Sequence, residues 1–134
     1  MLRLKGGERS RAKRRARTGL RSFMGVVLVA KYLWQASYTA EGVKGVIKDG
    51  GSGRRDAIEK LVADLGGTLE AFYFAFGDND VYVIADLPDN TTAAAVSLAV
   101  GGTGLVRIKT AVLLTPDEVD RAAHTTVGYR APGK

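Results

Sequence analysis

The order in which the hydrophobic period changes along the chain is the strongest constraint on its fold. Residues Lys31–Tyr38 alternate between two sets of side chains, which is the period of a strand. From Thr39 the apolar spacing becomes helical, and it changes again several times. The later segments are a strand, a second strand, a helix and a last strand, at residues 68–76, 81–87, 90–100 and 105–114. The sequence therefore predicts the order strand, helix, strand, strand, helix, strand.

Glycine, proline and capping residues mark the ends of these segments. Gly50–Gly53 interrupts the first helical segment, so we expect a break or kink there. Gly77–Asp80 contains only turn-forming residues, which favours an antiparallel hairpin between its flanking strands. Thr115–Glu118 combines an N-cap threonine, a proline at the first helical position and a glutamate three residues after the cap. This capping box predicts a last helix, whose end is marked by Gly128 and Pro132.

This order of segments, joined by right-handed crossovers, predicts an α+β fold. It is the ferredoxin-like split βαββαβ sandwich, with an antiparallel sheet, two helices on one face and an added C-terminal helix. Thr68–Phe76 is apolar on both faces and bounded by glycines, which predicts a central strand. Its alternation also places large apolar side chains on both sides of the sheet.

Covering the second face of this sheet requires a partner. Aromatic rings left in water would forfeit several kcal/mol of stabilisation, which is comparable to the stability of a small domain. We therefore expect a homodimer or higher oligomer in which two sheets pack face to face, as in a dimeric α/β barrel, and enclose a small cavity. A bound apolar ligand and the terminal helix are the alternative covers.

Composition excludes several kinds of site. The 134 residues suffice for one domain and contain no cysteine, which excludes disulfides, thiol catalysis, iron–sulfur clusters and Cys-ligated zinc. A single histidine, His124, excludes a multi-histidine metal site, so we expect neither a metal nor a cofactor. No stretch reaches the roughly 18 apolar residues needed to cross a membrane. We expect a cytoplasmic protein with no membrane partner.

The net charge of +6 is concentrated at the N-terminus. Residues 1–22 hold nine basic side chains and one acidic one, whereas the rest of the chain is mildly acidic. We expect residues 1–23 to be a disordered basic extension and residues 24–134 to be the domain. A non-functional extension, with translation starting at Met24, is the favoured interpretation. A secretion signal, an organelle transit peptide and a basic arm for nucleic acid or an acidic surface stay open, and nucleic acid is expected to bind only through this extension.

Short motifs that follow one another in the domain carry a family resemblance. In chain order they are Tyr32-Leu33, Ser37-Tyr38-Thr39, Glu41–Gly45, Arg54-Arg55, Gly66-Gly67, Gly77–Val81 and Asp86–Asp89. From about Lys31 to Pro132 the chain resembles the GYD domain family of small, mostly bacterial proteins. The resemblance implies a ferredoxin-like domain of the kind that often pairs into dimeric α/β barrels, with no established biochemical activity. Asn79 stands where the family's eponymous tyrosine is expected, so a ligand contact made by that ring would be missing.

Two groups of residues are candidates for binding. Aromatic side chains of the predicted strands and hairpin are expected to line a ligand site or an interface: Trp34, Phe72, Phe74, Phe76 and Tyr82. Ser52, Arg54 and Arg55 follow the glycine break, where the amides of a helix N-terminus would favour an anion. A helix break with solvated arginines is the alternative interpretation of this second group.

Candidates for acid–base chemistry are Asp78, Asp80, Asp86 and His124. Turn formation explains the first two equally well, a position near the end of a strand explains Asp86, and a helix surface explains His124. The sequence predicts a homo-oligomeric module that binds a small ligand or a partner. The alternative is a small cofactor-free acid–base enzyme that uses the cavity between paired sheets, and whether the protein is an enzyme stays open.

Overall fold

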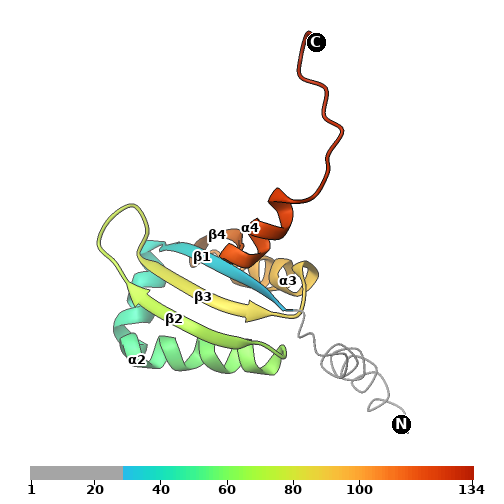
Figure 1. Cartoon of the computed structure of the whole chain (residues 1–134). Helices are drawn as coiled ribbons and strands as arrows, with labels where there is room; N and C mark the ends of the chain where they lie inside the picture. Colours follow the sequence, from blue (N-terminus) through green and yellow to red (C-terminus); the bar gives the residue numbers. More distant parts are fainter. Residues whose placement is uncertain (1–28) are drawn as a thin grey trace, which may run out of the picture.

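The computed structural model describes residues 29–134, in which four strands and three helices follow in the predicted order. They are β1 (Ala30–Tyr38), α2 (Ala40–Asp64), β2 (Thr68–Phe74), β3 (Val81–Leu87), α3 (Asn90–Gly101), β4 (Val106–Leu113) and α4 (Pro116–Ala123). The strands form one antiparallel sheet, and α2 and α3 lie on the same side of it (Figure 1). This arrangement is consistent with the predicted ferredoxin-like α+β sandwich. The predicted extension, residues 1–23, lies outside the described residues.

The strand order is β2-β3-β1-β4, so β1 and β3 form the centre of the sheet. The prediction that Thr68–Phe76 is a central strand is therefore wrong, because β2 ends at Phe74 and lies at the edge beside β3. The crossover through α2 skips one strand position, and β3 then returns into that position. A β-bulge between Leu69 and Ala71, a common feature of sheet edges, further marks β2 as an edge strand.

The hydrophobic core lies between the sheet and the two helices α2 and α3. Trp34 on β1 and Phe72 on β2 both pair with Val83 on β3, so these side chains share the helix-covered face. The opposite face, called the open face below, carries Tyr73 and Tyr82 as a cross-strand pair. The expectation of many large rings on both faces is thus wrong, because the strand register turns most of the rings toward the helices.

The predicted break in the first helix is confirmed. Gly50 has φ 80° and ψ 160°, a non-helical conformation in the left-handed range of φ that glycine adopts without a steric penalty. Directly after it, the helix passes close to the edge strand, since a Cβ at Gly51 would lie 3.1 Å from the Phe74 ring. The kink therefore lets the second half of α2 run along the sheet.

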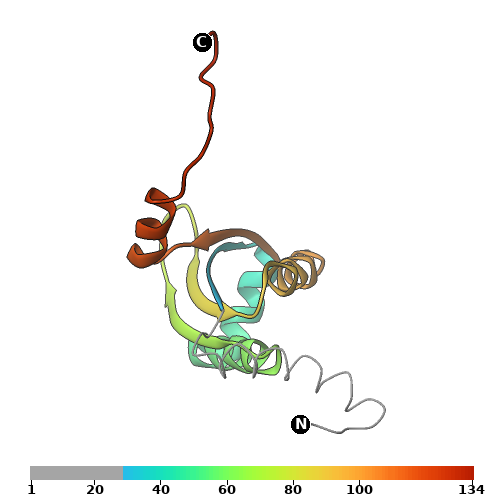
Figure 2. The ribbon, with the colours of Figure 1, turned by 45° about the vertical axis from the view of Figure 1, so that its right-hand side comes forward.

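The last helix begins as predicted but is shorter. Thr115 and Glu118 form the complete capping box, and the Asp89 side chain caps α3 by accepting a hydrogen bond from the Thr92 amide. However, α4 ends at Ala123, so the expectation that Gly128 marks its end is wrong. Helix α4 lies on the side of the sheet opposite to α2 and α3 (Figure 2). Within residues 29–134 no helix is long and apolar enough to span a bilayer.

Candidate functional site

A cavity of about 60 Å³ lies between the sheet and the two helices that cover it. By the same measure one water needs about 10–15 Å³, so the cavity has room for a group of a few heavy atoms. All four strands and both helices contribute to its apolar wall, which includes Trp34, Ile58, Phe72, Val83, Val96 and Ile108. The wall is apolar because these residues occupy the core-facing positions of each element.

A wider groove of about 270 Å³ adjoins this cavity at the kinked half of α2. The two spaces share the side chains of Tyr38, Arg54, Val100 and Val106. Gly45 lines the groove, and a Cβ at this position would have no atom within 4 Å. The absence of a side chain there keeps the groove open next to the apolar cavity.

Arg54 is the charged residue in the walls of both spaces. Its side chain is 29% exposed, and its partner within residues 29–134 is Asp49, at an N–O distance of 3.5 Å. This is a loose ion pair, because charge-assisted hydrogen bonds are about 2.7–2.9 Å long. Most of the guanidinium donors are therefore available to a further acceptor.

The structure separates the two arginines that the predicted anion site would have used together. Arg55 forms ion pairs with Glu59 at 3.0 Å and Asp56 at 3.8 Å on the surface of α2. Ser52 is exposed and does not line either space. Of the three predicted anion-binding residues, only Arg54 lies at the cavity.

Trp34 forms part of the cavity wall and is 3% exposed. Its indole Nε1–H has no acceptor among the described residues. A buried donor without an acceptor costs about 1–3 kcal/mol, so this ring is held in place by packing and not by its polar group. As the one tryptophan of the chain, it also reports on the cavity by its fluorescence.

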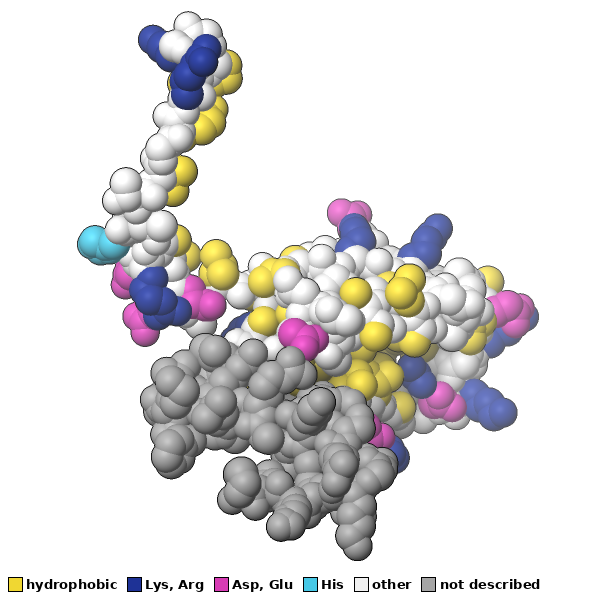
Figure 3. Space-filling view, turned by 90° about the vertical axis from the view of Figure 1, so that its right-hand side faces the viewer, with side chains coloured by type: hydrophobic (Ala, Val, Ile, Leu, Met, Phe, Trp, Pro, Cys, Tyr) yellow, Lys and Arg dark blue, Asp and Glu magenta, His cyan; other side chains and the backbone are white. Residues whose placement is uncertain are grey.

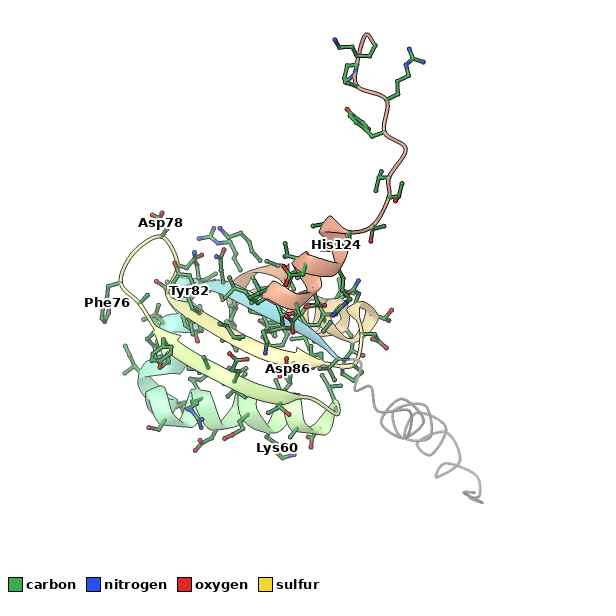
Figure 4. All side chains as sticks on the ribbon, viewed as in Figure 1. Lys60, Phe76, Asp78, Tyr82, Asp86 and His124 are labelled. Carbon is green, nitrogen blue, oxygen red and sulfur yellow. The ribbon has the colours of Figure 1, made fainter. Side chains whose placement is uncertain are left out.

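The five predicted aromatic residues do not form one surface. Trp34 and Phe72 line the cavity, and Phe74 packs against Phe72 edge to face with 5.3 Å between ring centroids. Phe76 is fully exposed in the hairpin loop, pointing away from the domain (Figure 4). Tyr82 lies on the open face. The structure therefore brings two of the five to the cavity, with Phe74 beside them.

The predicted acid–base residues are not brought together either. Asp78 is in the hairpin, Asp86 is near the opposite end of β3, and His124 caps the C-terminal end of α4 (Figure 4). Asp80 accepts a hydrogen bond from the Tyr38 amide at 2.8 Å, which fixes the hairpin to β1. At about 3.3 Å per residue, Asp80 and Asp86 are about 20 Å apart along the strand. These four residues do not form a common acid–base centre.

Asp86 belongs to an ion cluster on the open face. Lys31 Nζ donates to Asp86 Oδ1 at 2.9 Å and also to Glu70. The hydrogen bond to Glu70, followed by that to Asp86, raises the pKa of Lys31 above its ordinary value. This cluster explains the polar residues at this end of the sheet without a catalytic role.

The raised pKa of Lys31 predicts a loss of stability at alkaline pH. The folded protein holds this proton more tightly than the unfolded chain does. The contribution of protonated Lys31 to stability is therefore complete below about pH 10.4 and disappears as the pH rises through the folded pKa. The free energy of unfolding in urea should therefore fall more between pH 8 and pH 11.5 for the wild type than for Lys31→Met. The control Lys48→Met should keep the wild-type pH dependence, and an unchanged dependence in Lys31→Met would contradict the assignment.

Asn79, where the resemblance led us to expect a tyrosine, is 7% exposed. Its Nδ2 donates to the Tyr82 hydroxyl at 3.4 Å, so the residue ties the hairpin to the open face. Sequence reasoning treated Asn79 as a turn former that lacks a tyrosine's ligand contact, and it did not predict this hydrogen bond. It also missed Gly45 and Val96 as wall residues, because helical periodicity locates a core-facing side chain but not the gap between two helices.

Comparisons with known proteins agree with the fold. The family model for the GYD domain matches residues 32–123, from the third residue of β1 to the last residue of α4. No curated protein and no solved structure matches the chain. Within residues 29–134 no group of three or more His, Asp or Glu side chains could hold a metal ion. The match covers most of the domain, and the chain belongs to the GYD domain family.

Proposed function

We propose that the protein is a self-associating module that binds a small, mostly apolar molecule carrying one anionic group between α2 and α3. The position of Arg54 supports this proposal, since the residue lines both the apolar cavity and the adjoining groove. A guanidinium pairs well with a carboxylate, and an apolar cavity takes up the rest of such a molecule. The volume of about 60 Å³ suits an apolar part of a few heavy atoms.

Binding is favoured over acid–base catalysis by the positions of the polar residues. Asp78, Asp80 and Asp86 lie outside both cavity walls, and Asp86 is already paired with Lys31. Self-association is proposed to use the open face, as in the paired sheets that the sequence predicts. A chamber between two such sheets stays a prediction, and the cavity within one chain lies on the other side of the sheet.

The ligand proposal can be tested by titrating the protein with hexanoate while recording the fluorescence of Trp34. We expect hexanoate to change the emission, and 1-hexanol, which lacks the charge, to bind at least tenfold more weakly. Arg54→Met should lower the hexanoate affinity about tenfold to a hundredfold, because a hydrogen bond to a charged group contributes about 1.5–3 kcal/mol. The affinity for 1-hexanol should not change in this variant.

Two further variants make the test specific. Arg55→Met removes the neighbouring positive charge, which faces Glu59 and not the groove, and should leave hexanoate binding unchanged. Gly45→Leu should fill the groove and weaken binding, while thermal unfolding confirms that the fold is kept. The proposal fails if hexanoate leaves the emission of Trp34 unchanged, or if it binds Arg54→Met as tightly as the wild type.

A further inference from the structure

The C-terminal segment, residues 114–134, stands clear of the domain and is called the arm. Its helix α4 buries none of its residues, and the rest of the arm extends away from the sheet (Figure 1). Hydrophobic side chains are exposed along it (Figure 3). They are Leu114, Val119, Val127 and Tyr129, with exposed fractions of 61%, 50%, 74% and 74%. The arm therefore presents apolar side chains that nothing in its own chain covers among residues 29–134.

The helix of the arm is too short to be stable without packing. Isolated helices below about 12–15 residues are marginal in water, and α4 has eight. Its capping box with Thr115 contributes about 1 kcal/mol, which defines where the helix begins but does not replace a packed face. A well-capped helix with an exposed Val119 is suited to a surface that another molecule provides.

The open face offers an apolar surface of the required kind. Leu33 on β1 pairs with Ile84 on β3 and Ala111 on β4, and Ile84 pairs with Ala71 on β2. These four residues, called the apolar row, cross all four strands. Residues beside them along β1 and β3 point into the core, so the apolar row faces away from α2 and α3. No helix of the same chain packs over it within residues 29–134.

Charges on the arm and on the open face are complementary. Helix α4 carries Asp117, Glu118 and Asp120 against one base, Arg121. On the open face, Arg107 and Lys109 of β4 pair with Ser37 and Gln35 of β1 and are exposed. Neither basic side chain forms an ion pair within residues 29–134. An acidic helix is therefore attracted to the basic end of this face.

We propose that the arm is exchanged between two copies of the chain, so that each arm packs on the open face of the partner. The apolar side chains of the arm then lie over the partner's apolar row, and the acidic residues of α4 lie near Arg107 and Lys109. This inference rests on the proposed self-association and assigns the segment that holds the two copies together. It also explains why the open face needs few aromatic rings.

The proposal is tested by measuring the mass of the full chain by sedimentation over a range of concentrations. We expect the wild type to be a dimer, and the double variant Val127→Asp/Tyr129→Asp to raise its dissociation constant at least tenfold. Leu98→Asp and Ile47→Asp are matched controls, because these apolar residues are equally exposed, at 77% and 76%, but lie on α3 and α2. Neither control should change the dissociation constant.

A charge exchange tests where the arm binds. Lys109→Glu should weaken the dimer about three- to tenfold at low salt, and adding Asp120→Lys in the same chain should restore it. A monomeric wild type overturns both self-association and arm exchange. A dimer that is insensitive to Val127→Asp/Tyr129→Asp overturns arm exchange alone. Failure of Asp120→Lys to restore the dimer overturns the placement of the arm on the open face.

Discussion

Replacement of Gly67 by alanine is expected to lower the free energy of unfolding by about 3 kcal/mol or more. A Cβ at this position would lie 2.1 Å from the Asp86 carbonyl oxygen, 2.8 Å from Leu87 Cδ2 and 3.1 Å from Val62 Cγ1. Leu87 and Val62 are fully buried. A backbone oxygen cannot rotate away as a side chain can, so the variant must shift β2 relative to β3.

The same glycine also closes helix α2. Its amide donates to the Val62 carbonyl oxygen at 2.9 Å, and a shift that relieves the clash would strain this bond. The effect therefore extends to the helix that lines the cavity. We expect a lower midpoint of urea unfolding, while the slope of the free energy of unfolding against urea concentration stays unchanged.

Gly77→Ala is the matched control for this prediction. Gly77 lies in the exposed hairpin loop, its φ is not positive, and a Cβ there would have no atom within 4 Å. The stability of this variant should stay within about 0.5 kcal/mol of the wild type. If Gly67→Ala proves as stable as Gly77→Ala, the close approach of β2, β3 and α2 at this point is wrong.

Local features of the fold could be predicted from sequence because their causes lie within a few residues. Thr115 with Glu118 begins a helix through hydrogen bonds to neighbouring amides, and Gly50 interrupts one through its own backbone conformation. The hairpin after Phe74 has the same local origin. Such features do not depend on which strands become neighbours.

The positions of the strands and of the site depend on contacts that the period of the sequence does not contain. β2 has the composition of a central strand but lies at the edge, because the crossover left the central position to β3. The face taken by Phe72 follows from its register with Val83. Arg54 was predicted to act with Arg55, yet only the side chain of Arg54 turns toward the cavity. To predict any of these outcomes, one must know which elements far apart in sequence lie close together in the fold.

Trp34→Ala is expected to cost about 3–5 kcal/mol, the range measured when a large buried ring is truncated. The ring is 3% exposed and contacts a core built from the sheet and both helices. Because a space of about 60 Å³ already adjoins it, truncation would join the two volumes into one larger apolar cavity. The surrounding helices then lose packing on their inner faces, and thermal unfolding should report the loss.

Trp34→Phe is the informative comparison, since it keeps most of the ring and removes only the indole N–H that has no acceptor among the described residues. Removing a buried unpaired donor stabilises the folded protein by about 1–3 kcal/mol, which offsets the smaller loss of packing. We therefore expect this variant to stay within about 1 kcal/mol of the wild type. Benzene or indole, added to saturation, should raise the melting temperature of Trp34→Ala but not that of Trp34→Phe, because only the first has an apolar space large enough to bind them. Equal destabilisation of the two variants would contradict this expectation and show instead that the indole N–H is paired in solution.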